Sequence, residues 1–357
     1  MNQIKKIFLA AFLLTSFFSL LTSCDEKNAN TTSTTIDYPA AYVVNGESNS
    51  LSVINLNTDE VAQTIDLTSL GVSDVMYPHH IYYHNNAGAR YLSIAVPGMD
   101  FSEGHNGGMD GMPGKALILD AATGNLVHDL ELPAMDHNAL YSPDGTEIWT
   151  GQMTDDGTVL VYDAATYNLK NTINVGMMPA EVTFSADGSK AYVCNGMSND
   201  VTVINPSDKS VITTIAVGED PVGAWPGNDG NMYVDNEMSQ SISVIDVATN
   251  TVMQTIDLGF MPGFASHLAG ANELWVTDPD NGKVHYWNWD ADMNMWMHGG
   301  SFDAGMGAHA ITFTADSKKA YVTNQMAASV SVIDVPTHTK IKDIPTGVKP
   351  NGIVLVQ

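Results

Sequence analysis

The chain is poor in cysteine and in positive charge. Its 357 residues include 2 cysteines, and 14 lysines and arginines stand against 40 aspartates and glutamates, so the net charge is −26. Two cysteines exclude a disulfide framework. The negative charge repels nucleic acid and anionic membrane surfaces but attracts cations. We therefore expect a metal ion and a basic or redox protein as candidate partners, and no nucleic acid.

Short catalytic and cofactor motifs are also absent from the sequence. It contains no G-x-S-x-G, no H-E-x-x-H and no phosphate-cradling glycine loop. It also lacks C-x-x-C-H, which excludes covalently attached haem of that type. No residue is singled out as catalytic, and a binding protein is favoured over an enzyme.

The one long apolar run lies at the N-terminus. Ile7–Leu21 follows Lys5 and Lys6, as in a secretory signal, and is too short for a permanent membrane span. L-T-S-C (21–24) resembles the lipobox of bacterial lipoproteins, which implies cleavage after residue 23 and a lipid on Cys24. The alternative is an ordinary signal peptide with an incidental cysteine. Without residues 1–23 the charge becomes 12 − 40 = −28.

Residues 24–38 are predicted to join the lipid to a domain at 39–357. D-E-K (25–27) resembles the acidic surface-export signals of Bacteroidetes lipoproteins, and Asn28–Asp37 is a threonine-rich stretch typical of a flexible tether. We expect a lipoprotein of the outer membrane or cell surface that faces the periplasm or the exterior. The membrane is then contacted only through the anchor.

From residue 39 onward, one four-strand pattern repeats. Its clearest copy has alternating runs at Ile311–Phe313, Ala320–Thr323, Val330–Ile333 and Lys340–Ile344, separated by turn residues, which indicates antiparallel strands. The aromatic residue of the second strand recurs at spacings of 41 to 58 residues: Tyr42, Tyr91, Trp149, Tyr192, Tyr233, Trp275 and Tyr321. Four strands per repeat of this length are typical of a β-propeller.

The two ends of the domain complement each other. The first copy starts at its second strand, Ala41–Asn45, and P-N-G-I-V-L-V-Q (350–357) reads as an isolated first strand. Pairing them would remove two open sheet edges. The prediction is an all-β, seven-bladed propeller of four-stranded antiparallel blades, closed by the C-terminal strand in blade 1.

Four of the second strands share a motif. Y-V-V-N (42–45), Y-V-C-N (192–195), Y-V-D-N (233–236) and Y-V-T-N (321–324) resemble the YVTN family of propeller repeats. The resemblance covers about residues 40–357. It implies the fold and leaves the function open, because such propellers serve as scaffolds, surface proteins and enzyme domains.

The repeat register places three histidines at one mouth of the central channel. Twelve residues before the marker aromatic, where the first strand enters the channel, lie His79, His137 and His309 in blades 2, 3 and 7. His80 is adjacent to the first of them. Blades 4, 5 and 6 place Ala180, Val222 and about Gly263 there, and blade 1 places Asn351.

Methionines are predicted to gather on the same face. Met135 and Met306 lie just before the channel-entry position, and 13 of the 19 methionines share the face: Met76, Met99, Met109, Met112, Met135, Met153, Met177, Met178, Met197, Met238, Met261, Met306 and Met326. Imidazoles and thioethers without thiolates favour copper, Cu(I) in particular. We predict a copper site of His79, His80, His137 and His309 with Met135 and Met306 as further ligands. Alternatively, the methionines fill gaps under loops or form a docking surface.

A second resemblance concerns the first pair of histidines. H-H-I-Y-Y-H-N-N-A-G-A-R-Y-L (79–92) resembles a stretch of the nitrous oxide reductase propeller, in which histidines from several blades hold a copper cluster at the channel mouth. The match covers His79 and His80, whereas His84 falls out of register. Blades 4 and 5 have no histidine at the entry position, so the resemblance implies a simpler copper site.

The sequence leaves three functions open. The leading hypothesis is an extracytoplasmic, lipid-anchored propeller that binds copper at its channel mouth. The first alternative is a protein-interaction or adhesion propeller without metal. The second is a redox enzyme related to nitrous oxide reductase or to haem-binding nitrite reductase propellers.

Overall fold

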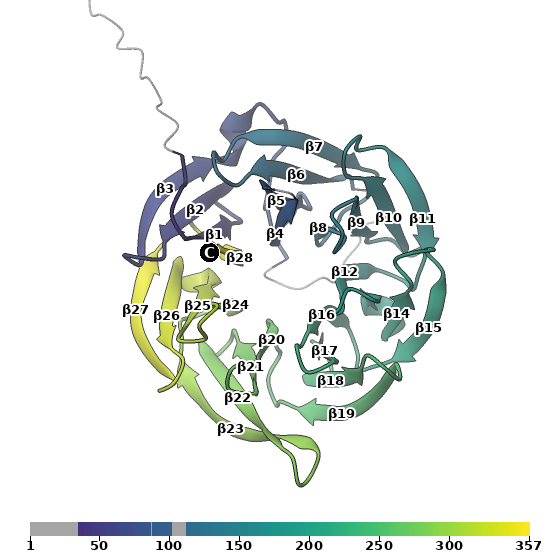
Figure 1. Cartoon of the computed structure of the whole chain (residues 1–357), viewed down its shortest axis with the longest axis vertical. Coiled ribbons are helices and arrows are strands. Elements are labelled where there is room, and N and C mark those ends of the chain that lie inside the picture. The colour runs from purple at the N-terminus through teal and green to yellow at the C-terminus, as the bar shows by residue number, and fades with distance from the viewer. Residues whose placement is uncertain (1–34, 87, 102–111) are drawn as a thin grey trace, which may run out of the picture. The chain divides into compact units, whose positions relative to one another are not determined.

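The computed structural model describes residues 35–86, 88–101 and 112–357. In this part of the chain, seven four-stranded antiparallel sheets stand in a ring (Figure 1), which confirms the predicted seven-bladed propeller. Thr35–Gln357 forms one compact unit. The predicted signal segment, Cys24 and most of the tether lie outside the described residues, as does most of the insertion at 99–114.

Each blade begins with an inner strand at the channel and ends with an outer strand. Blade 1 consists, in this order, of β28 (Pro350–Val356), β1 (Ala40–Asn45), β2 (Ser50–Asn55) and β3 (Glu60–Asp66). Blade 2 consists of β4 (Ile81–Asn86), β5 (Ala89–Val96), β6 (Gly114–Asp120) and β7 (Leu126–Leu132). Blade 3 consists of β8 (Ala139–Tyr141), β9 (Glu147–Gln152), β10 (Thr158–Asp163) and β11 (Leu169–Asn174). Blade 4 consists of β12 (Pro179–Phe184), β13 (Ala191–Asn195), β14 (Asp200–Ile204) and β15 (Val211–Ala216).

The remaining blades follow the same order. Blade 5 consists of β16 (Pro221–Pro226), β17 (Asn231–Asn236), β18 (Ser241–Asp246) and β19 (Thr251–Asp257). Blade 6 consists of β20 (Ala265–Leu268), β21 (Glu273–Asp278), β22 (Lys283–Asp290) and β23 (Met295–Asp303). Blade 7 consists of β24 (Ala308–Phe313), β25 (Lys319–Asn324), β26 (Ser329–Asp334) and β27 (Thr339–Pro345). Within the described residues, three short 3-10 turns occur: η1 (Leu67–Leu70), η2 (Gly196–Ser198) and η3 (Gln325–Ala327).

The C-terminal strand closes the ring as predicted. β28 pairs antiparallel with β1, with Ala41 opposite Leu355 and Val43 opposite Ile353. Blade 1 is therefore assembled from the two ends of the propeller sequence. At the other end of the described chain, Ile36 is buried and its N–H donates to Ala122 O. The chain thus packs against the propeller within the stretch predicted as tether.

The repeated aromatic residues form much of the core between blades. Tyr42, Trp149, Tyr192, Tyr233, Trp275 and Tyr321 are among the largest fully buried side chains. Tyr321 of blade 7, for example, packs in one cluster with Val43 and Ile353 of blade 1. Burying a large apolar side chain stabilises the fold by about 1.5–3 kcal/mol. Each blade is therefore held by its neighbour.

The asparagine of the Y-V-x-N motif has a structural role. Asn45 Nδ2 donates to Ser50 Oγ at 3.1 Å and to Ser52 Oγ at 3.0 Å, across the turn between the second and third strands. Asn236 and Asn324 make the same pair of bonds to the serines of their own blades. The motif thus fixes the turns of one face, where the inner strands begin.

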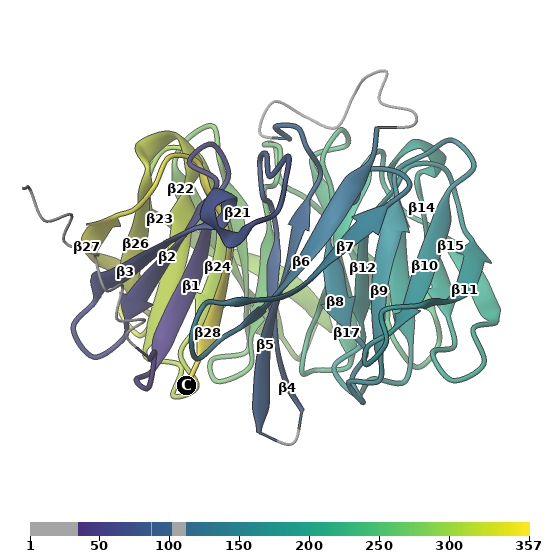
Figure 2. The same ribbon diagram turned by 90° about the horizontal axis from the view of Figure 1, so that it is seen from above.

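The strands run between the two faces of the ring (Figure 2). Function can therefore reside in the loops of either face or in the channel that the inner strands surround. In the portion that the structure describes, no helix is long and apolar enough to cross a bilayer.

Candidate metal centre at the channel mouth

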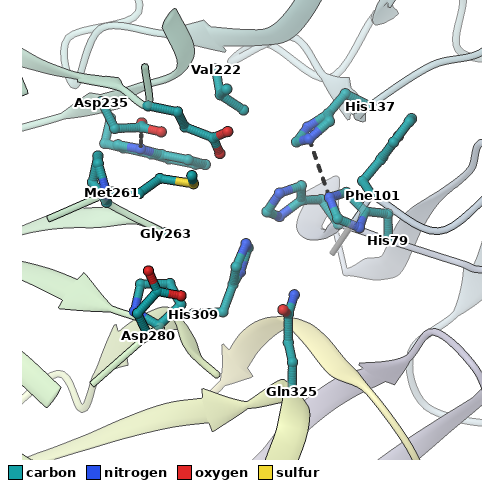
Figure 3. Close-up of a pocket in the computed structure, with 15 residues that line it drawn as sticks. His79, Phe101, His137, Val222, Asp235, Met261, Gly263, Asp280, His309 and Gln325 are labelled. Atoms are coloured by element: carbon teal, nitrogen blue, oxygen red, sulfur yellow. Dashed lines mark hydrogen bonds between the residues drawn. The ribbon is translucent and has the colours of Figure 1, made fainter. Parts of the chain in front are cut away.

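The four predicted histidines surround one cavity. His79, His80, His137 and His309 line a space of about 210 Å³ at the start of the inner strands (Figure 3). His79 and His80 immediately precede β4, His137 precedes β8, and His309 is the second residue of β24. The repeat register thus brings together side chains from blades 2, 3 and 7.

Backbone contacts position the first pair. The N–H of His79 donates to Ala95 O at 2.9 Å, and the N–H of Ala95 donates to His80 O at 3.1 Å. Gly352 of β28 packs directly against the pair, because a Cβ there would lie 2.9 Å from both His79 O and His80 Cα. Glycine in the closing strand therefore allows blade 1 to support these histidines.

A side-chain clamp positions His137. Its neighbour Asn138 donates from Nδ2 to Val182 O at 2.8 Å and accepts from the N–H of Val182 at 3.0 Å. These two bonds tie the start of β8 to β12 of blade 4. They also set His137 beside Glu181.

Three of the histidines form a compact donor set. One ring nitrogen of each of His79, His80 and His137 lies within 4.8 Å of the others, and all three side chains are buried. Nε2 of His79 and Nε2 of His137 are 3.2 Å apart (dashed in Figure 3). Two imidazoles that bind one ion tetrahedrally, with metal–nitrogen bonds of about 2.0–2.1 Å, would have their nitrogens about 3.3 Å apart. The spacing therefore fits a shared metal ion.

The sequence analysis missed the carboxylate behind this set. Glu181, which is fully buried, places Oε1 2.7 Å from His137 Nδ1 and 3.3 Å from His80 Nε2. Its Oε2 accepts from the Tyr82 hydroxyl at 2.7 Å. With Glu181 ionised, the carboxylate accepts from His137 Nδ1, and a neutral His137 then has its lone pair on Nε2. This is the carboxylate–histidine arrangement that orients metal ligands.

A sequence signal for Glu181 did exist. It directly follows Ala180, the entry position of blade 4, in an inner strand that is otherwise apolar or hydroxylic, P-A-E-V-T-F. An acidic residue in a buried strand requires hydrogen-bond or ion-pair partners, which makes it a candidate site residue.

His309 stands apart from the compact set. Its ring centroid lies 6.2 Å from that of His79 and 5.8 Å from that of His80, and the residue is partly buried. It lines the same cavity but does not belong to the group of three. The four histidines therefore form a compact group of three, with His309 as a separate residue on the same cavity.

The two predicted methionine ligands do not line the cavity. Met135 is fully buried in a small cluster with Phe101 and Met153, below the loops. Met306 is 49% exposed on the face outside. Met261 does line the cavity (Figure 3). The methionines of this face therefore divide into buried packing residues and exposed ones, and Met109 lies outside the described residues.

The opposite side of the cavity carries residues that the sequence analysis did not single out. Trp225 of β16 donates from Nε1 to Asp235 Oδ1 at 2.6 Å, and both side chains line the cavity. Burial raises the pKa of Asp235 well above its usual value, with Glu237 nearby adding to the shift. Val222 and Gly263, the register equivalents in blades 5 and 6, also line the cavity.

The remaining described histidines and the buried cysteine lie elsewhere. His84 stacks on Tyr141, His128 on Tyr167 and His338 on Tyr286, whereas His285 Nδ1 lies 3.4 Å from His298 Nε2 in blade 6. His267 faces Asn272, at the far end of β20. Cys194 is buried, which raises the pKa of its thiol. None of these residues lines the cavity of the three histidines.

Comparison with known proteins supports the fold alone. No family model matches the chain, and no curated protein matches its sequence. Among solved structures it is similar to a protein of unknown function from Desulfotomaculum acetoxidans, at 13% identity and a TM-score of 0.70 over 89% of this chain and 99% of that one. It is also similar to the periplasmic gluconolactonase of Pseudomonas aeruginosa, at 14% identity and a TM-score of 0.69 over 89% and 99%. Hydrazine synthase of Kuenenia stuttgartiensis follows at 16% identity and a TM-score of 0.63 over 78% and 95%.

Proposed function

We propose that this propeller binds one transition-metal ion at its channel mouth, with copper as the expected metal. The observation that supports the proposal is the buried group of His79, His80 and His137, whose ring nitrogens lie within 4.8 Å of one another. His79 and His137 would bind through Nε2. Glu181 would offset part of the metal's charge and hold the ring of His137 in place.

The donor set narrows the choice of metal without fixing it. Three imidazoles suit copper, zinc, nickel or iron, and copper is bound most tightly among the divalent first-row ions. The thioether argument for Cu(I) now depends on Met261, because Met135 and Met306 do not line the cavity. A thioether ligand would favour Cu(I) over zinc.

The proposed setting is outside the cytoplasm. A lipid on Cys24 would hold the propeller at the outer membrane or cell surface, where its charge of −28 attracts cations from solution. Storage, delivery or sensing of copper are the functions that a binding protein in this place could serve. Ions enter the cavity from the face on which the methionines are exposed.

The experiment is a competitive metal titration. Metal-free protein is titrated with Cu(I), Cu(II) and Zn(II) against a chelator, and the titration is repeated with His79→Ala, His137→Ala and His309→Ala combined. We expect a single site and a loss of affinity of at least about a hundredfold in the variant, since a bound ion would lose two of its three imidazoles. His128→Ala, at a histidine remote from the cavity, serves as the control. Equal affinity in the triple variant and the wild type would sink the proposal.

A further inference from the structure

The cavity has two walls of different chemistry (Figure 3). The imidazoles of His79, His80 and His137 form one wall. The opposite wall belongs to blades 5 and 6 and carries Trp225, Glu237 and Asp280. Trp225 is 7% exposed, Glu237 is partly buried and Asp280 is exposed. The second wall therefore presents carboxylates around an aromatic ring.

The cavity is unsuited to an anion. Among the described residues that line it, none is lysine or arginine. A bound phosphate or carboxylate would thus lack the charged donors that such groups require. The net charge of −26 acts in the same direction.

The indole of Trp225 is fixed in orientation. Its N–H donates to Asp235, and its ring packs against Phe264 in a tilted arrangement, with a centroid distance of 3.8 Å. Gly223 leaves room for it, because a Cβ at that position would lie 2.2 Å from Cζ2 of the indole. Tryptophan offers the most favourable aromatic face to an organic cation, and a rigid ring loses little freedom on binding.

A buried amide points into the same space. Gln325 of η3 is 8% exposed and lines the cavity, and Figure 3 shows its amide directed inward. Its side chain has no hydrogen-bond partner among the residues that the structure describes. The amide oxygen therefore faces the cavity and can accept a hydrogen bond from a ligand N–H.

We propose that the cavity binds a small organic ammonium ion. Its positive charge is stabilised by the indole of Trp225 and by the carboxylates of Glu237 and Asp280. The side-chain oxygen of Gln325 accepts a hydrogen bond from one of its N–H groups. The indole face attracts the cation through its π electrons, and the carboxylates add charge-assisted hydrogen bonds. The second wall, formed by blades 5 and 6, would bind the ammonium ion whether or not a metal is present. This inference therefore does not depend on the metal proposal.

The first experiment compares three ligands of one size. Metal-free protein is titrated by calorimetry with n-butylammonium, 1-butanol and butyrate, which share the carbon chain and differ in charge. We expect n-butylammonium to bind at least about tenfold more tightly than either of the others. If butanol or butyrate binds as tightly as the ammonium ion, the proposal is wrong.

Variants then separate the two walls. Glu237→Gln and Asp280→Asn should each weaken n-butylammonium binding by about three- to tenfold, and Gln325→Leu by a similar factor. Asp292→Asn removes an equal charge at an exposed turn of blade 6 and should change nothing. His79→Ala with His137→Ala should abolish metal binding and leave n-butylammonium binding within about twofold. Loss of ammonium binding in the histidine variant, with the carboxylate variants unaffected, would overturn the assignment to the second wall.

Discussion

At the scale of single residues, Glu181 is the one carboxylate found in contact with the histidine group among the described residues. It is fully buried and contacts two imidazoles and the Tyr82 hydroxyl. Asn138 donates to that hydroxyl at 3.2 Å and also ties β8 to β12. The carboxylate is thus held from several sides, as expected for a group that orients metal ligands.

Glu181→Gln should weaken metal binding by about 10- to 100-fold, because the amide keeps the shape but loses the charge that stabilises the cation. Chelator competition measures the change. Glu273→Gln is the matched control, since Glu273 also contacts a histidine, with Oε2 3.0 Å from His338 Nε2, but lies outside the cavity. Equal affinities for wild type and both variants would exclude a role for Glu181.

Asp235 makes stability depend on pH. Burial raises its folded-state pKa well above the usual value. The contribution of Asp235 to the free energy of unfolding is therefore fully present below the pKa of the unfolded carboxyl, about 3.9. This contribution is lost as the pH rises toward the folded-state pKa. Asparagine at this position can still accept from Trp225 Nε1 and does not ionise.

We expect Asp235→Asn to leave the melting temperature nearly unchanged at pH 4 and to raise it by about 2 °C or more at pH 8. Thermal unfolding of both proteins across this range measures the difference. A difference that stays constant with pH would show that Asp235 does not titrate as its burial implies.

Residue-level prediction from the sequence succeeded where the repeat register determined position. His79, His80, His137 and His309 line one cavity, although they come from three blades. Glu181 was missed although an acidic residue in a buried strand was a signal, because its contacts with His80 and His137 of other blades are not encoded by the register. Trp225 was missed because its bond to Asp235 joins two strands of blade 5 at positions that the register does not mark. Met135 shows the same limit, since its side chain packs on Phe101 and Met153 instead of lining the cavity.

At the scale of elements, the closing strand β28 matters most. It pairs with β1 along Ala40–Asn45, and Gly352 within it supports His79 and His80. Its loss would expose the edge of β1 and remove the strand that supports His79 and His80.

Deleting residues 351–357 should therefore eliminate soluble folded protein, instead of causing a local defect. The yield of monodisperse protein and its thermal unfolding are the measurements. Replacing Gln357 alone by alanine is the control, because this residue lies beyond β28 and the change removes only the bond that its Oε1 accepts from the N–H of Ala315. A truncated chain that melts within a few degrees of wild type would contradict the closure.

The elements themselves were predictable because each blade repeats the same alternation. In blade 7 the four predicted runs lie within β24, β25, β26 and β27. The recurring aromatic residue is explained by its packing between blades. The asparagine of Y-V-x-N is explained by its hydrogen bonds across the turn that follows the second strand. The start of the packed chain was less predictable, since Ile36 alone in a polar stretch gives no periodic signal.

At the scale of the whole molecule, the predicted lipid anchor on Cys24 can be tested directly. Cys24→Ala should move the protein from the membrane fraction to the soluble fraction without altering the melting profile, because only the lipid would hold it there. Fractionation after a salt wash measures this. Sedimentation of the variant with membranes would point to another anchor.

The central claim is that one ion is held by imidazoles from two blades at the channel mouth. The most direct test is a crystal of the copper-loaded protein measured at the copper absorption edge. The account predicts one dominant anomalous peak about 2.0–2.1 Å from Nε2 of both His79 and His137. Anomalous peaks only at exposed methionines such as Met326, with none between the histidines, would contradict it.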